Sequence, residues 1–558
     1  MSRRSSSTKR LSWLAWLAAG LCLLPICAVI LAATMGGLDT VRSLLGTVLP
    51  RYAGTTAALV LIVGLGTAVI GTGAAWLVTM TRFAGRQVLE IMLALPLAFP
   101  AYVLAYAYTD FLDHPGWVQT TLRDLTGWGP RDYWFPEIRS LGGAAAMLTF
   151  VLYPYVYLLA RAAFLQQSAT AYIAARTLGQ TPWGAFLRVS LPIARPAIAG
   201  GMLLAIMETL ADFGTVSYFA VQTFATGIYQ SWFAFFDRAA AAQLALCLLV
   251  VALVVASLER MQRRDQRHHG AGRRFERMQP IELTGAKAVG AIVFCGLPVL
   301  LGFIGPTILL ITMGWDSGQI LFTPRYLAFL QNSVTLAAIA AVLTVAAAVF
   351  LGFNARLHPT RPARTAVQIA GIGYAVPGGV IAVGLLVPFA AFDNAVDAFM
   401  EANFGIDTGL LITGSIWLMI VAYMVRFMAV AINTYESGMS TVNPNLDAVS
   451  RTLGHDPSSM LRRVHIPIIS PSVLTALLIV FVDVMKELPA TLILRPFNYD
   501  TLAVQAHRLA ADERLHEAAV PSLVIGAVGL LPVALLCWGI GRESRRAQDM
   551  RHATPAKT

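Results

Sequence analysis

The sequence predicts an all-α, polytopic membrane protein with about 12 transmembrane helices, arranged as two parallel six-helix repeats. Three observations support this prediction. Hydrophobic residues make up 57% of the 558 residues and charged residues only 13%, whereas about a quarter of a soluble globular chain is charged. The apolar residues form runs of about 20 or more, which is the length that crosses a hydrocarbon core of roughly 30 Å. One polar, proline-containing segment also occurs twice, at a shift of 275 residues.

Twelve apolar spans are expected along the chain. They lie near residues 11–34, 55–80, 87–111, 141–165, 197–221, 239–257, 286–313, 330–353, 366–392, 409–433, 472–495 and 518–541. The first span follows a short basic segment, as a signal peptide would. Because its apolar run is longer than the roughly 7–15 residues of a signal-peptide core, we expect it to stay as a transmembrane helix.

The distribution of lysine and arginine over the loops predicts the orientation. With the N-terminus in the cytoplasm, the cytoplasmic loops and the adjoining span ends carry 29 of the 41 basic residues, and the opposite loops and span ends carry 10. An excess of basic residues marks cytoplasmic loops, so both termini are expected there. The net charge of +11 is explained by these loops, of which 258–279 is the most basic, and predicts no nucleic-acid partner.

The remaining loops and the cysteines offer little chemistry. The opposite-side loop 112–140 is aromatic and rich in Pro and Gly, and 393–408 is acidic. Each could dock a partner, or could be an ordinary loop at the membrane interface. All five cysteines fall inside apolar runs without a CxxC or metal-ligand spacing, and His268 and His269 lie in the basic linker, so no metal site is assigned.

The repeated segment sets the domain organisation. It reads RTLGQTPWGAFLRVSLPIARP from Arg176 to Pro196 and RTLGHDPSSMLRRVHIPIISP from Arg451 to Pro471. Upstream, FPAYVLA and VPGGVIA align at nearly the same shift, so the whole half is repeated. Six spans in each half give both halves one orientation, related by an axis along the membrane normal. Two equivalent halves favour a transporter with a path between them.

Each copy of the segment is expected to form a helix–turn–helix elbow on the cytoplasmic surface. A glycine ends the first helix, a proline begins the second, an arginine is shared, and a further proline ends the second helix. These residues are Gly179, Pro182, Arg188 and Pro192 in the first copy, and Gly454, Pro457, Arg463 and Pro467 in the second. Such a knob suits a groove of another protein, but a stiff loop between two spans has the same local features.

The elbow resembles the EAA loop of ABC importer permeases. It reads AARTLG…SLPIARP and then AVSRTLG…HIPIISP. The acidic first residue of the family is missing, because Ile173 stands in the first copy and Asp447 stands one place early in the second. A salt bridge from that acid is therefore not supported. The resemblance implies a type I ABC importer permease fold with coupling roles for Ala174, Ala175, Gly179, Arg188, Pro192, Ala448, Gly454, Arg463 and Pro467.

A fused pair of permease domains follows from two such elbows. The expected organisation is a first domain over 1–257, a basic linker over 258–285, a second domain over 286–541 and a cytoplasmic tail over 542–558. The sequence contains no P-loop motif G-x-x-x-x-G-K-[ST]. We therefore expect a transport subunit, not an enzyme, that binds no cofactor itself. Its expected partners are a separate cytoplasmic ATPase that uses ATP, one copy per elbow, and a solute-binding protein.

Ionisable residues occur inside the span that follows each elbow. They are Glu208 and Asp212 in the first half and Asp483, Lys486 and Glu487 in the second. Each carboxylate pair is spaced i, i+4 and is expected on one helix face. A charge at mid-bilayer costs at least about 2.5–3.5 kcal/mol, so these residues should face the protein interior.

Two interpretations of these charges remain open. The carboxylates could line a cation path or gate, since hard cations favour oxygen ligands. Alternatively they pin helices, with Lys486 neutralising Asp483 at i, i+3.

The amino-acid sequences of the two spans resemble those of ferric-iron ABC permeases of bacterial inner membranes. The matching stretches are ETLADFGTVSYFAVQTFATGIYQSW from Glu208 and DVMKELPATLILRPFNYDTLAV from Asp483. The resemblance implies ferric iron as cargo and an inner-membrane location. Thiamine and phosphonates such as 2-aminoethylphosphonate are alternative cargoes for the same architecture, and an ion-coupled secondary transporter is the alternative mechanism.

Overall fold

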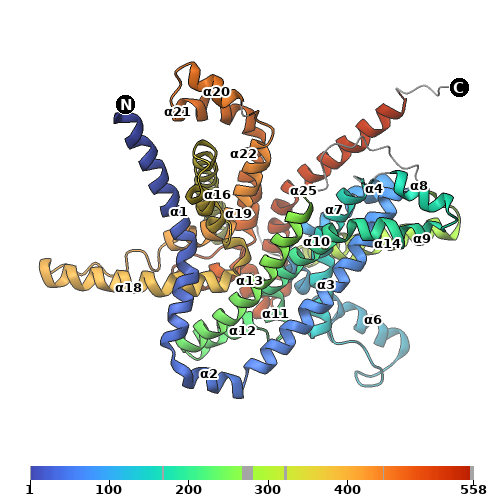
Figure 1. The fold of residues 1–558 in the computed structure, drawn as a ribbon. Coiled ribbons are helices and arrows are strands. Elements are labelled where there is room, and N and C mark those ends of the chain that lie inside the picture. Colours follow the sequence, from blue (N-terminus) through green and yellow to red (C-terminus); the bar gives the residue numbers. More distant parts are fainter. Residues whose placement is uncertain are drawn as a thin grey trace. The chain divides into compact units, whose positions relative to one another are not determined.

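The computed structural model describes residues 2–165, 167, 169–266, 281–318, 323–443 and 445–552 (Figure 1). Within these ranges nearly every regular element is a helix, and one two-residue strand pair is the exception. Eleven of the described helices are long and apolar enough to cross a membrane, or 12 if a bent pair counts as one span. The predicted all-α membrane architecture is confirmed.

The chain folds into two compact units, and each unit draws on both sequence halves. Unit 1 comprises Met1–Tyr52, Phe224–Ala252 and Ile320–Gln505, and unit 2 comprises Ala53–Thr223, Leu253–Gln319 and Ala506–Thr558. The first span of each half therefore packs in the unit that the other half mainly builds. The predicted domains over 1–257 and 286–541 describe the sequence repeat, whereas the packing units cut across them.

Unit 1 is built around three helices, α16, α19 and α22, which pack against one another. The N-terminal helix α1 lies across α17 and α18, and the backbone of Pro25 approaches Gly384 so closely that no side chain fits there. The elements are α1 (Ser2–Met35), α2 (Gly37–Gly46), α12 (Phe224–Tyr229), η3 (Gln230–Ala234), α13 (Arg238–Gln266, shared with unit 2), α16 (Pro324–Leu357), α17 (Arg361–Ala370), η5 (Gly373–Ala375), α18 (Gly378–Phe404), α19 (Ile416–Met439), α20 (Asn445–Thr452), α21 (Pro457–Met460), η6 (Leu461–His465), α22 (Ile466–Met485), α23 (Pro489–Leu494) and α24 (Leu502–Ala511).

Unit 2 is centred on α7 and α10, and α3 and α14 share their core, whereas α15 and α25 pack against each other and against α5. Its elements are α3 (Leu49–Met80), β1 (Thr81–Arg82), α4 (Arg86–Met92), η1 (Leu95–Ala98), α5 (Ala101–Leu112), α6 (Trp117–Thr126), α7 (Leu141–Leu165), α8 (Ala169–Thr177), α9 (Pro182–Ala185), η2 (Phe186–Ser190), α10 (Leu191–Ala211), α11 (Gly214–Tyr218), β2 (Ile281–Glu282), α14 (Ala286–Val299), η4 (Leu300–Ile304), α15 (Gly305–Asp316) and α25 (Leu515–His552).

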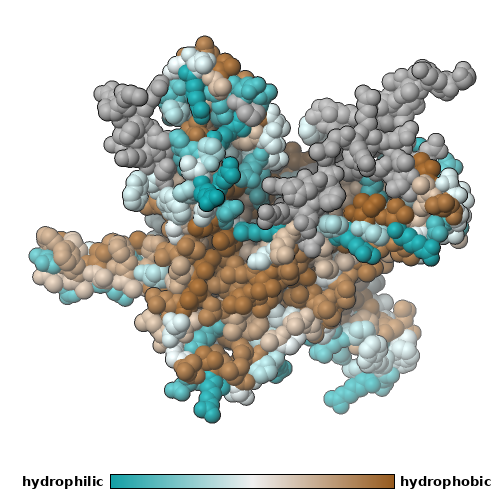
Figure 2. Space-filling model, viewed as in Figure 1, coloured by the Kyte–Doolittle hydropathy of each residue, from teal (hydrophilic) through white to brown (hydrophobic). Residues whose placement is uncertain are grey.

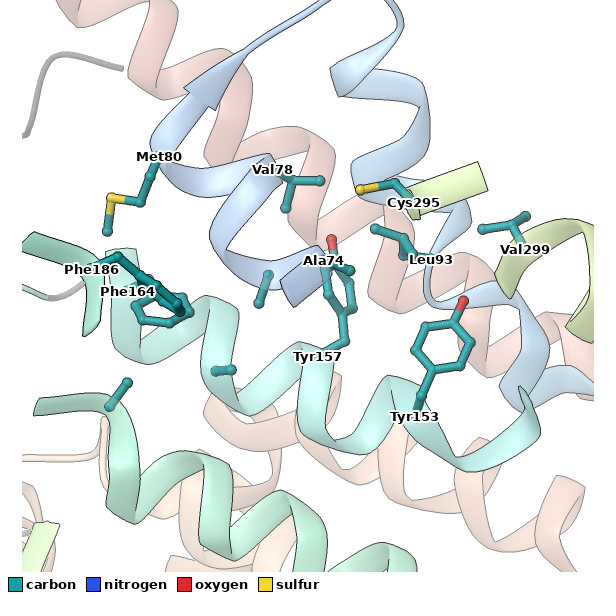
Figure 3. Packing of buried hydrophobic residues seen from close by; sticks show 13 residues of the cluster. Ala74, Val78, Met80, Leu93, Tyr153, Tyr157, Phe164, Phe186, Cys295 and Val299 are labelled. Carbon is teal, nitrogen blue, oxygen red and sulfur yellow. The ribbon is translucent and has the colours of Figure 1, made fainter. Parts of the chain in front are cut away.

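The core of unit 2 joins membrane helices to the first elbow. Tyr153 and Tyr157 of α7 and Cys295 of α14 are fully buried in this core. Phe186, from the elbow, and Phe164, from the end of α7, meet at one edge of it (Figure 3). A single apolar cluster therefore connects the elbow to the helices that cross the membrane. Because protein interiors are closely packed, a displacement of the elbow is transmitted to these helices.

Several predicted spans are interrupted in the structure at repeat-related places. The helices of predicted spans 197–221 and 472–495 end early, at Ala211 and Met485. Predicted spans 87–111 and 366–392 break before Pro100 and Pro377, which hold extended backbone as N-caps of α5 and α18. A proline disfavours helical geometry in the residue before it, so the sequence repeat FPAYVLA/VPGGVIA is a repeated helix break.

Candidate coupling elbows and intramembrane carboxylates

Both elbows turn at a glycine with left-handed backbone. Gly179 and Gly454 each have φ of +82°, a conformation that other L-residues adopt only at a cost. The turns close with equivalent hydrogen bonds, since the Gln180 N–H donates to the Ala175 carbonyl and the His455 N–H donates to Ser450. The predicted glycine stop of the first elbow helix, α8 or α20, is confirmed.

The second elbow helices begin at the predicted prolines. Pro182 and Pro457 are the first residues of α9 and α21, a position where the missing proline N–H costs nothing. A side chain caps each start: Thr181 Oγ1 accepts from the Gly184 N–H, and the Asp456 carboxylate accepts from the Ser458 N–H. The two turns therefore have the same architecture although their residues differ.

The predicted ends at Pro192 and Pro467 are wrong. The helices continue from Pro182 to Ala211 and from Pro457 to Met485, through π-helical turns at Phe186–Ser190 and Leu461–His465. A π turn shifts the hydrogen-bond pattern by one residue, so a proline just after it removes no regular i→i−4 bond. Each elbow is thus continuous with the span that follows it.

The residues assigned to coupling lie on the elbow surfaces in most cases. Arg188 and Arg463 are exposed, and so are Ala174 and Ala448, whereas Ala175 is buried beneath the first elbow. The elbows also expose apolar side chains, namely Ile173, Leu178, Trp183 and Leu187 on the first and Leu446, Val449 and Leu453 on the second. The second elbow, α20 and α21, is coloured mostly hydrophilic against the brown helices below it (Figure 2).

The two elbows are anchored to their units by different chemistry. Tyr172, Ala175 and Ala185 form a small apolar cluster under the first elbow, and Ile281 of β2 packs against it. The second elbow instead uses Asp447, which forms an ion pair with Arg356 of α16 at 2.7 Å. The sequence did not support a salt bridge from that carboxylate, and the structure shows one.

Asp447 is partly buried between its basic neighbours. Burial alone would raise the pKa of this carboxyl, but hydrogen bonds from Arg356 and His465 outweigh burial and lower it. The carboxylate therefore stays ionised at neutral pH.

Asp212 and Glu487 occupy the same structural position in the two halves. Asp212 follows the end of α10 and accepts hydrogen bonds from the backbone N–H groups of Thr215 and Val216, both at 3.1 Å. Glu487 follows the end of α22 and accepts from Ala490 and Thr491 at 2.9 and 3.1 Å. Each carboxylate thereby caps the short helix, α11 or α23, that begins after a break in the span.

The helix breaks also show that the expected placement of each carboxylate pair on one helix face is wrong. Asp212 and Glu487 stand beyond the helix ends that precede them, so the i, i+4 geometry does not extend to them. Glu208 and Asp483 are partly buried within α10 and α22, and none of the four acids is exposed. Lys486 forms an ion pair with Asp483 at 2.9 Å, as the helix-pinning interpretation expects.

Sequence reasoning missed two polar residues near these breaks. Arg426 of α19 lies 3.5 Å from Glu487, and its place inside a predicted span was the signal that could have found it. His507 lies in the part of α24 that belongs to unit 2, where it contacts the buried Tyr106 hydroxyl through Nδ1 at 3.1 Å and packs against Phe213. No counterpart in the repeat marks His507, so the sequence offered no signal for it.

Comparison with known proteins connects this geometry to transport systems. The family described as "Binding-protein-dependent transport system inner membrane component" matches residues 68–268 and 345–537, so each match contains one elbow. The chain is 26% identical to Fe(3+)-transport system permease protein FbpB 2 of Haemophilus influenzae, across 92% of this chain and 95% of that protein.

Two further relatives differ in how much of the chain they match. Ferric transport system permease protein FbpB of Actinobacillus pleuropneumoniae is 22% identical over 76% of this chain and 61% of its own length. The molybdenum transport system permease protein ModB of Escherichia coli K12 is 29% identical, over 33% of this chain and 79% of its own length. A relative of that size corresponds to one of the two repeats.

Proposed function

Because this chain belongs to the family of inner-membrane components of binding-protein-dependent transport systems, we propose that it is the permease subunit of an ABC importer for ferric iron. The family membership supports the resemblance of the two elbows to EAA loops. The observation that carries the proposal is that both repeats fall within the family match, each with one complete elbow.

The elbows are the proposed docking sites for a separate cytoplasmic ATPase, with one ATPase copy for each elbow. Their exposed apolar residues and their exposed arginines, Arg188 and Arg463, suit a groove on a partner protein. Each elbow continues without interruption into α10 or α22. A displacement of the elbow would therefore reach the capped break at Asp212 or Glu487 along one helix.

Ferric iron is the proposed cargo because the relative that covers nearly the whole chain bears a ferric-transport name. The molybdenum permease matches only one third of this chain, and so supports the architecture more than the cargo. The acids near the helix breaks suit a cationic cargo better than an oxyanion. Their proposed role is to shape the break in each span, and contact with cargo is not required for it.

The proposed setting is the inner membrane of a bacterium, with both termini and both elbows in the cytoplasm. The excess of basic residues in the loops on that side supports this orientation. A solute-binding protein would deliver the cargo to the opposite face.

Reconstitution into proteoliposomes with the partner ATPase and binding protein tests this function. We expect uptake of radioactive iron that requires ATP inside the liposome and the iron-loaded binding protein outside. Uptake of thiamine or a phosphonate in place of iron would overturn the cargo. Iron uptake without the ATPase, abolished by a protonophore, would instead identify an ion-coupled secondary transporter.

A further inference from the structure

We propose that Arg356, Asp447 and His465 form a pin that fixes the second elbow to unit 1, and that no such pin holds the first elbow among the described residues. The consequence is mechanical: the second elbow moves α16 and α19 with it as one body, whereas the first elbow, which apolar contacts anchor, is held less rigidly against its unit. This inference rests on the proposed coupling function of the elbows, but the pin itself can be tested separately.

The pin joins three elements, α16, α20 and η6, at one carboxylate. Arg356, in the last turn of α16, donates to Asp447 through Nε at 2.7 Å and through Nη2 at 3.3 Å. The Nε2 of His465, at the end of η6, lies 2.7 Å from the same carboxylate. Two charge-assisted contacts from one guanidinium fix both distance and orientation, so α20 cannot rotate freely against α16.

The same arginine also holds the turn that leads into the elbow. Its Nη1 donates to the Met439 carbonyl at 3.3 Å, and its Nη2 donates to the Val442 carbonyl at 3.1 Å. These carbonyls lie at and just beyond the end of α19. Arg356 therefore connects the end of α16 to the end of α19 and to the elbow that follows α19.

Burial makes the pin rigid. The side chain of His465 is fully buried and lies edge-on against Phe353, with ring centroids 5.5 Å apart. Its Nδ1 has no hydrogen-bond partner among the described residues, a condition that costs free energy. The ring is thus held on its Nε2 side, by Asp447.

The first elbow solves the same packing problem without charges. The repeat places Thr79, Tyr172 and Ser190 at the positions of Arg356, Asp447 and His465. Among the described residues, Thr79 bonds only to carbonyls of its own helix, and the Tyr172 hydroxyl and Ser190 Oγ are buried without a partner.

An uncharged anchor is therefore possible in this fold, and it occurs once. Buried ion pairs are weak contributors to stability but can fix one geometry. The charged cluster of the second elbow is therefore better explained by a positioning role than by a purely stabilising role.

Spin labels on matched exposed sites test the pin in the full-length protein bound to its ATPase. Val449→Cys on the second elbow and Ala174→Cys on the first occupy equivalent positions, in a background with the native cysteines replaced. We expect the Val449 label to be less mobile than the Ala174 label. Asp447→Asn should raise the mobility at Val449 several-fold and leave Ala174 unchanged. Equal mobility in the unsubstituted protein, or no response at Val449, would overturn the pin.

Transport then tests what the pin does. In proteoliposomes, Asp447→Asn should lower the number of iron ions imported per ATP several-fold, while Tyr172→Phe, the matched change in the first elbow, should not. The swap Arg356→Asp with Asp447→Arg should recover part of the ratio, which a loss of folding would not. An unchanged ratio in Asp447→Asn would overturn the mechanical role.

The two measurements separate this inference from the proposed function. If the unsubstituted complex imported no iron with ATP, the proposed function would fail, and the label mobilities would still decide whether the pin exists. Should Asp447→Asn fail to fold, His465→Gln, which keeps a donor near Nε2, takes its place with the same expected direction and a smaller effect.

Discussion

At the scale of single residues, the carboxylates of Asp212 and Glu487 hold the broken spans together. A helix break at membrane depth exposes backbone N–H groups that lipid cannot satisfy. Each carboxylate satisfies two of them and also accepts from a threonine hydroxyl, Thr215 or Thr491. The repeat preserved this function with a different acid in each half, which indicates that the oxygen atoms matter more than the length of the side chain.

The capping role makes a prediction that separates it from a path role. Asp212→Asn keeps an oxygen acceptor and should retain most of the stability and transport, whereas Asp212→Ala should lower the free energy of unfolding by about 1 kcal/mol, as loss of a helix cap does. Thermal unfolding of the purified protein and iron uptake measure this difference. If Asn and Ala abolished transport equally in stable protein, the negative charge itself would be required and the carboxylate would line the path.

Glu487 should be the more sensitive of the two positions. Its carboxylate is almost fully buried and is paired with Arg426, so its removal leaves a cation without its partner inside the membrane protein. A lone buried charge is costly, and Glu487→Gln should therefore destabilise more than Asp212→Asn does.

Arg139 precedes α7, at the end of that helix away from the first elbow, and it connects the loop at Asp113 with the loop at Glu513. Its guanidinium binds the Glu513 carboxylate through both Nη atoms, at 2.6 and 2.7 Å, binds Asp113 at 3.0 Å and lies over the ring of Tyr218. The hydrogen bond from Arg139 lowers the pKa of Glu513 below its ordinary value, although partial burial opposes it. The ionised carboxylate is therefore favoured by folding.

The sign of this pKa shift predicts a pH dependence. A carboxyl whose pKa is lowered on folding adds stability above its unfolded pKa of about 4.3, and loses that contribution as the pH falls through the lower folded value. The difference in melting temperature between the native protein and Glu513→Gln should thus be constant from pH 7 to 5 and shrink below about pH 4. A difference that grew in acid would contradict a stabilising contact between Arg139 and Glu513.

At the scale of elements, each elbow combines a left-handed glycine, a capped proline start and a π turn. The first two features were predictable, because Gly179, Gly454, Pro182 and Pro457 act through their own backbone restrictions. The π turn was not, since no residue type specifies it. The π turn follows from fitting Pro192 and Pro467 into a continuous helix. From the sequence alone, those prolines were expected to end the second helix of each elbow.

The elbow glycines give a prediction at this scale. A Cβ at Gly179 or Gly454 meets no atom within 4 Å, so substitution is limited by the φ of +82° alone. Alanine at either position should destabilise the turn by about 1 kcal/mol, because it must adopt the left-handed backbone conformation. It should not block the surface of the elbow. Glutamate at the same positions adds a charge to that surface and should reduce ATPase association further. Pull-down of the ATPase by both variants distinguishes these effects, and equal binding by alanine and glutamate variants would show that the surface is not used.

At the scale of the whole molecule, the two compact units exchange helices between the sequence halves. The repeat, the number of spans and the elbows could be read from the sequence because they depend on local composition and period. The exchange of α1 and of α14 and α15 could not, since apolar helices such as these fit many neighbours equally well. Local contacts such as Gly384 with Pro25 decide it, and they require the folded structure.

The exchange predicts how the two halves behave as separate chains. Residues 1–266 alone lack α14, α15 and α25, which are parts of unit 2. Residues 281–558 alone lack α1, which is part of unit 1. Neither half should yield stable, monodisperse protein by itself, whereas co-expression should give a pair that purifies together. Stable, monodisperse protein from either half alone would show that the exchanged helices are not needed for folding.

Cross-linking at the elbow tips tests whether the elbows dock the ATPase. Leu178 and Leu453 occupy equivalent positions and are strongly exposed, at 82% and 71%. In a cysteine-free background, Leu178→Cys and Leu453→Cys should each cross-link to the partner ATPase, and nucleotide should change the yield, whereas Leu125→Cys on the opposite face should not react. Failure of both elbow cysteines to cross-link in an intact, transporting complex would contradict the docking role of the elbows.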